Sequence, residues 1–176
     1  ILVYSNISKN NIFKDQWLYI HDENIKSGRI TNFNNWIPEI INKNDGTVLA
    51  NEYWSDKEGY LWNLDDKSLI DICAKDLMKC GFISSKNDVI DYKVIKVPKC
   101  YPIYSENYSN EINEIKEKLK KFNNLNLIGR YGSFKYNNQD HSILMGHLCA
   151  NNIVHGEKND LWEINNDDIY QESAKV

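Results

Sequence analysis

The order of its segments is the feature of the sequence that most constrains the fold. Stretches rich in aromatic and β-branched residues come first, at 1–4, 17–20 and 47–54, and such stretches favour strands. Segments with apolar residues at helical spacing follow, and they alternate with two more strand-like segments, at 89–97 and 125–128. This order predicts an α+β fold in which a mixed or antiparallel β-sheet carries about three helices.

The helices are expected from their apolar spacing and from the residues at their ends. The first is expected at about 66–80, because Asp65 is a typical N-terminal cap and Gly81 a typical C-terminal stop. The second, at about 110–122, has one apolar face and one face of Glu and Lys. The third is expected at about 140–153, so helices and strands interleave in the second half of the chain.

The composition argues against several classes of partner. The chain has 176 residues, of which 41% are hydrophobic, which is enough for a soluble protein with a real core. No apolar run approaches the roughly 20 residues of a membrane-spanning helix. The net charge of -4 argues against a nucleic acid or an anionic membrane as partner. We expect a cytoplasmic protein that binds a small molecule, and the sequence leaves its oligomeric state open.

The cysteines and histidines do not form the pattern of a metal site. The cysteines belong to no C-x-x-C pair and to no cluster of zinc spacing; they are Cys73, Cys80, Cys100 and Cys149. His141 and His147 are six positions apart, so they lie on different faces of the expected helix. We therefore expect reduced thiols and no metal.

The most informative stretch is LIGRYGSFKYNNQDHSILMGHL, residues 127–148. We expect a buried strand to end at Gly129 and a polar loop to lead into the third helix. The free N–H groups and the positive dipole end of that helix would face the loop, which is favourable for an anion. Arg130 adds a guanidinium suited to phosphate, and Tyr136 adds a hydroxyl.

A simpler interpretation explains the same residues. An ordinary strand–loop–helix connection would use Asn138 or Asp140 as the helix cap. The residues alone leave both interpretations open.

Several segments resemble one enzyme family in the same order. The stretch IGRYGSFKYNNQDHSILMGHLCANNI resembles the C-terminal flavin-contacting segment of the FAD-dependent amine oxidase superfamily, in particular of the UDP-galactopyranose mutases and the protoporphyrinogen-oxidase-like proteins. SGRITNFNNW resembles an arginine segment of that family, KVPKCYPIY a tyrosine–proline segment, and NEYW a Glu-Tyr strand. Together these segments extend from Arg29 to Ile153.

The resemblance implies roles for particular residues. It implies that FAD is bound by Gly129, Arg130, Asn138, Gln139 and Asp140. It implies that the substrate is bound by Arg29, Tyr101 and Tyr136. Asn138 and Gln139 stand where the mutases usually carry Asp and Met, and a neutral amide at 138 cannot supply the same charge. The sequence assigns no catalytic residue.

The resemblance also implies a missing part. The chain has no G-x-G-x-x-G motif, the motif that holds the FAD pyrophosphate in this superfamily. We therefore expect the chain to be part of a longer parent polypeptide that carries the dinucleotide-binding half. The expected division is a substrate-domain-like part at 1–124, the last strand and helix of the FAD-binding domain at 125–155, and a polar tail at 156–176.

The expected function follows from this resemblance. The parent would be an FAD-dependent oxidoreductase or mutase that acts on a sugar nucleotide in polysaccharide precursor synthesis. Two alternatives stay open: a flavin oxidase or desaturase that acts on an apolar substrate, and a non-catalytic domain that binds sugar nucleotides or proteins. In each flavoenzyme case, the 176-residue chain alone would be inactive and would not retain FAD.

Overall fold

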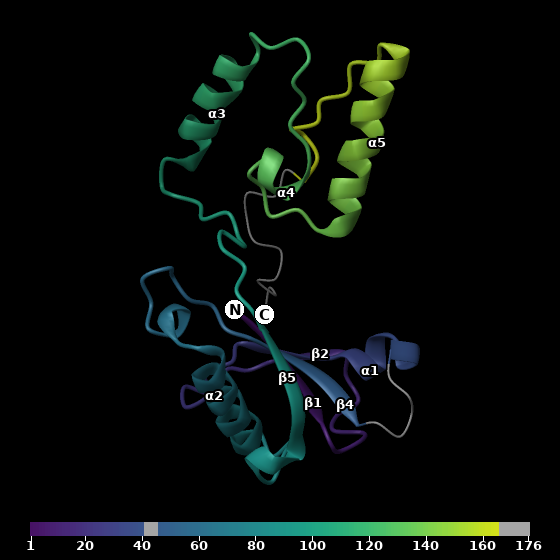
Figure 1. Cartoon of the computed structure of the whole chain (residues 1–176). Coiled ribbons are helices and arrows are strands. Elements are labelled where there is room, and N and C mark those ends of the chain that lie inside the picture. Colours follow the sequence, from purple (N-terminus) through teal and green to yellow (C-terminus); the bar gives the residue numbers. More distant parts are fainter. Residues whose placement is uncertain (41–45, 166–176) are drawn as a thin grey trace, which may run out of the picture. The chain divides into compact units, whose positions relative to one another are not determined.

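The chain divides into two compact units, which we describe separately. The computed structural model describes residues 1–40 and 46–165 (Figure 1). Unit 1 is Ile1–Pro98, and unit 2 is Lys99–Val176, described as far as residue 165. The three-part division expected from the sequence stays a prediction, and residues 166–176 of the expected tail lie outside the described residues.

Unit 1 is built on a five-stranded sheet with the order β2-β3-β4-β1-β5. The strands are β1 (Leu2–Ile7), β2 (Trp17–Tyr19), β3 (Arg29–Asn32), β4 (Thr47–Glu52) and β5 (Val89–Ile95). All four pairings are antiparallel. The expected α+β class with an antiparallel sheet is confirmed, and β3 adds a strand that the periodicity did not predict.

One face of the sheet packs against helix α2 (Asp66–Lys79). The strand β1 alternates between buried and half-buried residues, so that Val3 and Ile7 point into the core. The helix contributes the apolar stripe that its spacing predicts, with Leu69 and Leu77 fully buried. Asp65 caps it as expected, since its side chain accepts a hydrogen bond from the Ser68 N–H at 2.7 Å.

Short helical turns connect the strands of unit 1. They are α1 (Phe33–Trp36), η1 (Pro38–Ile40), η2 (Leu61–Asn63) and η3 (Lys86–Asp88). In η3, Asp88 accepts backbone hydrogen bonds from Ser84 and Ser85 and forms an ion pair with Lys9. This carboxylate therefore joins the start of β5 to the segment that follows β1.

Unit 2 contains helices and no strand among its described residues. The helices are α3 (Tyr108–Leu119), α4 (Gly129–Gly132) and α5 (Gln139–His155). Both long helices lie where the apolar spacing predicts them. No helix in the described part of the chain is long and apolar enough to cross a bilayer.

The expected strand at 125–128 is wrong. Ile128 is extended, with φ -134° and ψ 162°, but no strand of the described residues pairs with the segment. A strand needs a neighbour to satisfy its backbone N–H and C=O groups. Leu125 and Ile128 are 46% and 42% exposed, so they do not form a buried strand before Gly129.

The apolar core of unit 2 is small. Among its described residues, the buried hydrophobic side chains are Met145, Cys149 and Leu161, with Leu148 and Ile164 packed beside them. The helix α3 has no fully buried residue. The start of the tail is held on α5 through Leu161, while Lys116 of α3 lies 4.6 Å from the centre of the Trp162 ring.

Candidate functional site

Two buried polar side chains organise the loop between α4 and α5. Ser133 is fully buried and donates its hydroxyl to the Gly129 carbonyl at 2.7 Å. Asn137 is 2% exposed, and its Nδ2 group donates to Ser133 Oγ at 3.2 Å and to Met145 Sδ at 3.1 Å. Each buried group therefore has partners, as buried polar groups in proteins generally do. The polar loop is a fixed structural element.

The tail holds the same loop from the other side. Asn165 donates to Asn137 Oδ1 at 3.0 Å and to the Tyr136 carbonyl at 3.1 Å. Lys135 Nζ donates to the carbonyls of Trp162 and Asn165 at 2.7 and 3.1 Å. Sequence reasoning missed these contacts because they join positions 27 to 30 residues apart that share no periodicity.

Three of the expected site residues lie together beside this loop. The Arg130 Nε group donates to the Asn137 carbonyl at 3.0 Å. The Arg130 guanidinium carbon lies 4.6 Å from the Tyr136 ring centre and 5.5 Å from that of Tyr101. The two rings stack, with centres 5.4 Å apart and planes 7° apart. Cation–π contacts and one hydrogen bond thus fix the guanidinium.

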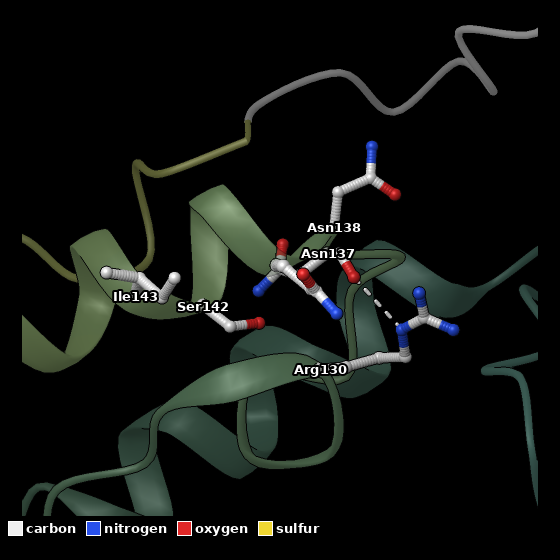
Figure 2. A pocket seen from close by; sticks show the side chains of 6 residues that line it. Arg130, Asn137, Asn138, Ser142 and Ile143 are labelled. Carbon is white, nitrogen blue, oxygen red and sulfur yellow. Dashed lines mark hydrogen bonds between the residues drawn. The ribbon is translucent and has the colours of Figure 1, made fainter. Parts of the chain in front are cut away.

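An open cavity of about 460 Å³ lies next to Arg130 (Figure 2). Its lining residues come from α4, from the loop after it and from the first turns of α5: Arg130, Asn137, Asn138, Gln139, Ser142 and Ile143. Arg130, Asn138 and Gln139 were expected at a cofactor site. Gly129 and Asp140 do not line the cavity, and Asp140 is exposed.

The exposed lining of the cavity is almost entirely apolar, and the charged residue in that lining is Arg130. Within the described ranges 1–40 and 46–165, no carboxylate forms an ion pair with Arg130. The backbone N–H of Asn138 donates to His141 Nδ1 at 3.2 Å, so this N–H at the start of α5 is already capped. The N-terminal end of α5 adds a positive dipole at the same place.

Arg29, the other expected arginine, has a different environment in unit 1. Its Nε and Nη2 groups donate to the two carboxylate oxygens of Glu52, each at 2.8 Å. Its guanidinium carbon lies 5.7 Å from the Tyr19 ring centre, and Nη1 donates to the Tyr19 hydroxyl at 3.3 Å. A bidentate carboxylate contact uses the planar fork that a phosphate would need. Binding of phosphate by Arg29 stays a prediction.

A buried carboxylate holds the segment that leads into Arg29. Asp76 of α2 is 2% exposed and accepts hydrogen bonds from the backbone N–H groups of Lys26 and Ser27 at 3.2 and 3.0 Å. It also accepts from the Tyr53 hydroxyl at 3.2 Å. Burial raises the pKa of Tyr53 well above its usual range, so this hydroxyl stays a donor. Sequence reasoning missed Asp76 because its acidic side chain does not continue the apolar stripe.

Comparison with solved structures supports the fold. No family model matches the sequence, and no curated protein matches it. A crystal structure of reduced UDP-galactopyranose mutase matches with a TM-score of 0.70 at 15% sequence identity. The match covers 90% of this chain and 34% of the mutase chain. The chain thus has a mutase-like fold and spans about a third of the length of that mutase.

Proposed function

We propose that the chain is the substrate-side and C-terminal flavin-contacting part of an FAD-dependent enzyme related to the UDP-galactopyranose mutases. The substrate would be a sugar nucleotide. Two observations support this proposal. One is the likeness to a mutase over 90% of the chain. The other is the cavity at the start of α5, where Arg130, Asn138 and Gln139 lie together.

The residues around the cavity fit one part of FAD. A diphosphate needs a fixed cation, hydrogen-bond donors and little competing negative charge. Arg130 supplies the cation, and Asn138 and Gln139 supply side-chain amide donors beside a helix N-terminus. The chain lacks the G-x-G-x-x-G motif that would hold the dinucleotide. On this proposal these residues would contact the part of FAD nearest Arg130, and another part of the parent polypeptide would hold the rest of the dinucleotide.

The observation that carries the proposal is the way Arg130 is held. Its Nε group is anchored on the Asn137 carbonyl and its plane lies against two stacked tyrosine rings. On this proposal the Nη groups would bind a phosphate beside the loop, and the side chain, already held, would lose little entropy on binding.

The role of this chain would be to bind and orient ligands. Bound FAD would supply the redox or nucleophilic chemistry. Arg130 and Asn138 would hold the cofactor or its phosphates, and Tyr101 and Tyr136 would line the substrate side. Because Asn138 is neutral, it would act as a hydrogen-bond donor and acceptor and would not add charge.

The test uses the longest natural polypeptide that contains this sequence. We expect it to retain FAD, measured by the absorbance spectrum of the purified protein. After anaerobic reduction we expect it to convert UDP-galactopyranose to UDP-galactofuranose, measured by chromatography. Oxygen consumption with an apolar substrate, and no sugar conversion, would favour the oxidase alternative. A polypeptide that binds neither FAD nor a sugar nucleotide would overturn the proposal.

A further inference from the structure

The loop between α4 and α5 is held by two tyrosine hydroxyls from an earlier segment of unit 2. The Tyr136 N–H donates to the Tyr104 hydroxyl oxygen at 2.7 Å. The Tyr108 hydroxyl donates to the Phe134 carbonyl at 2.8 Å. The Phe134 carbonyl and the Tyr136 N–H belong to the two peptide groups on either side of Lys135. The two hydroxyls therefore fix the backbone immediately before the Tyr136 side chain.

Both hydroxyls come from one short segment. Tyr108 is the first residue of α3, and Tyr104 lies four positions before it. Their ring centres are 4.4 Å apart, so each ring supports the other. Tyr101, three positions earlier still, stacks on the Tyr136 ring. We call Tyr104 and Tyr108 the tyrosine clamp.

The clamped part of the loop has an unfavourable backbone conformation. Phe134 has a φ of 48°, in the left-handed region that residues with a side chain rarely adopt. Its side chain is 40% exposed, so it is not fixed by a surrounding apolar core. A strained residue of this kind persists only where its surroundings hold it. The Tyr108 hydroxyl on its carbonyl and the Tyr108 ring, 6.0 Å from its own, supply that hold.

We propose that Tyr104 and Tyr108 are positioning residues, which hold Tyr136 against Arg130 and so favour FAD binding there. The ligand in this proposal rests on the proposed function. The Tyr136 ring centre lies 4.6 Å from the Arg130 guanidinium carbon. Without the clamp, Phe134 would relax toward a negative φ, and the loop would occupy conformations in which this ring no longer supports the guanidinium. A ligand binds more weakly when only part of the population is competent to bind it.

The experiment removes the two hydroxyls and keeps the rings. Tyr104→Phe and Tyr108→Phe are made in the longest natural polypeptide that contains this sequence, and the flavin-free protein is titrated with FAD while flavin fluorescence is followed. We expect each variant to bind FAD about three- to tenfold more weakly, the range for one neutral hydrogen bond. Tyr131→Phe, at a position on α4 that is 65% exposed, is the matched control and should bind FAD as the wild type does.

Two double variants separate positioning from a general loss of stability. In a protein that already carries Arg130→Ala, Tyr104→Phe should weaken FAD binding by less than about twofold, because the clamp acts through Arg130. In a protein that carries Tyr108→Phe, Phe134→Gly should restore FAD affinity, because glycine adopts a positive φ without strain. A fully additive loss in the first protein, or a further loss in the second, would overturn the positioning role.

A second measurement needs no ligand. Hydrogen exchange of loop residues 130–138 is followed by mass spectrometry in the flavin-free polypeptide, and both clamp variants should exchange faster than the wild type, whereas Tyr131→Phe should not. Unchanged exchange would overturn the clamp. Wild-type FAD affinity in both clamp variants would overturn its role in binding and leave the proposed function intact. A wild-type polypeptide that binds no FAD would contradict the proposed function, while faster loop exchange in the variants would still support the clamp.

Discussion

Unit 1 and unit 2 differ in how completely each encloses its own core. In unit 1 the sheet and α2 bury a continuous apolar cluster that includes Val3, Ile30, Leu49 and Leu77. In the described part of unit 2, α5 and the start of the tail bury Met145, Cys149 and Leu161. The polar network around Asn137 supplies much of the remaining order. Unit 1 thus encloses an extended apolar core, whereas the described part of unit 2 combines a small core with a network of buried hydrogen bonds.

The two arginines also differ, in how the charge of each side chain is compensated. Arg29 in unit 1 is paired with the Glu52 carboxylate on the neighbouring strand. Arg130 in unit 2 is held by a carbonyl and two aromatic rings, which leave its charge without a carboxylate partner among the described residues. Arg130 is therefore better prepared to bind an external anion than Arg29.

Thiol reactivity should give the largest difference between the units. Burial raises the pKa of the Cys73 thiol in unit 1 to about 12, so at pH 8 its thiolate fraction is about three orders of magnitude below that of an ordinary thiol. Cys149 is buried in the small core of unit 2, and Cys100 is exposed. We expect labelling in the order Cys100, Cys149, Cys73, measured by mass spectrometry over time. Faster labelling of Cys73 than of Cys149 would contradict the expected difference between the two units.

Truncation of a core side chain in unit 1 should give the next largest effect. Leu77 is fully buried between α2 and the sheet, so Leu77→Ala is expected to lower the free energy of unfolding by about 3 kcal/mol. The measurement is urea denaturation followed by far-ultraviolet circular dichroism. The neighbouring residue Met78 is 36% exposed, and Met78→Ala should change the free energy of unfolding by less than about 1 kcal/mol. Equal effects would show that α2 does not enclose the core.

Loss of the Asn137 side-chain amide in unit 2 should have a somewhat smaller effect on stability. Asn137→Ala removes hydrogen bonds to Ser133, Met145 and Asn165 and should lower the opening free energy of α5 by about 2 kcal/mol. Hydrogen exchange of the α5 amides measures this change. Asn126→Ala at an exposed position is the control. Unchanged exchange in the Asn137 variant would mean that apolar contacts alone order the loop.

Acid should weaken unit 1 through Asp88, with the smallest effect. Hydrogen bonds from the backbones of Ser84 and Ser85, assisted by Lys9, lower the pKa of Asp88 below its usual range. This stabilisation is present above the ordinary Asp pKa of about 3.9 and is lost as the pH falls through the lower folded value. Asp88→Asn should flatten the acid dependence of unfolding, measured by thermal denaturation from pH 6 to pH 2. Glu58→Gln, at an exposed position, should leave the acid dependence of unfolding unchanged.

Regular elements with a clear period were predictable from the sequence. The apolar stripe of α2 and the aromatic and β-branched stretches of β1 and β4 identify these elements. The expected strand at 125–128 failed because a short apolar run does not reveal whether a neighbouring strand is present. The fold class could thus be predicted, while the strand partners could not.

The candidate site was predictable in part. Of the expected cofactor residues, Arg130, Asn138 and Gln139 line the cavity, whereas Gly129 and Asp140 do not. The sequence did not reveal the Glu52 partner of Arg29 or the Asn165 contact to the loop, because both depend on tertiary contacts between distant residues. The ligand roles, the cytoplasmic location and the partners stay predictions.

The most direct test of the account is the FAD affinity of the long natural polypeptide with Arg130 replaced. Flavin is removed and added back, and its fluorescence is followed during the titration. Arg130→Ala should weaken FAD binding by about 1–3 kcal/mol, or roughly 5- to 150-fold, whereas Lys121→Ala, at an exposed position, should not change it. An Arg130→Ala protein that binds FAD as tightly as the wild type would contradict the assignment of the cavity to the cofactor.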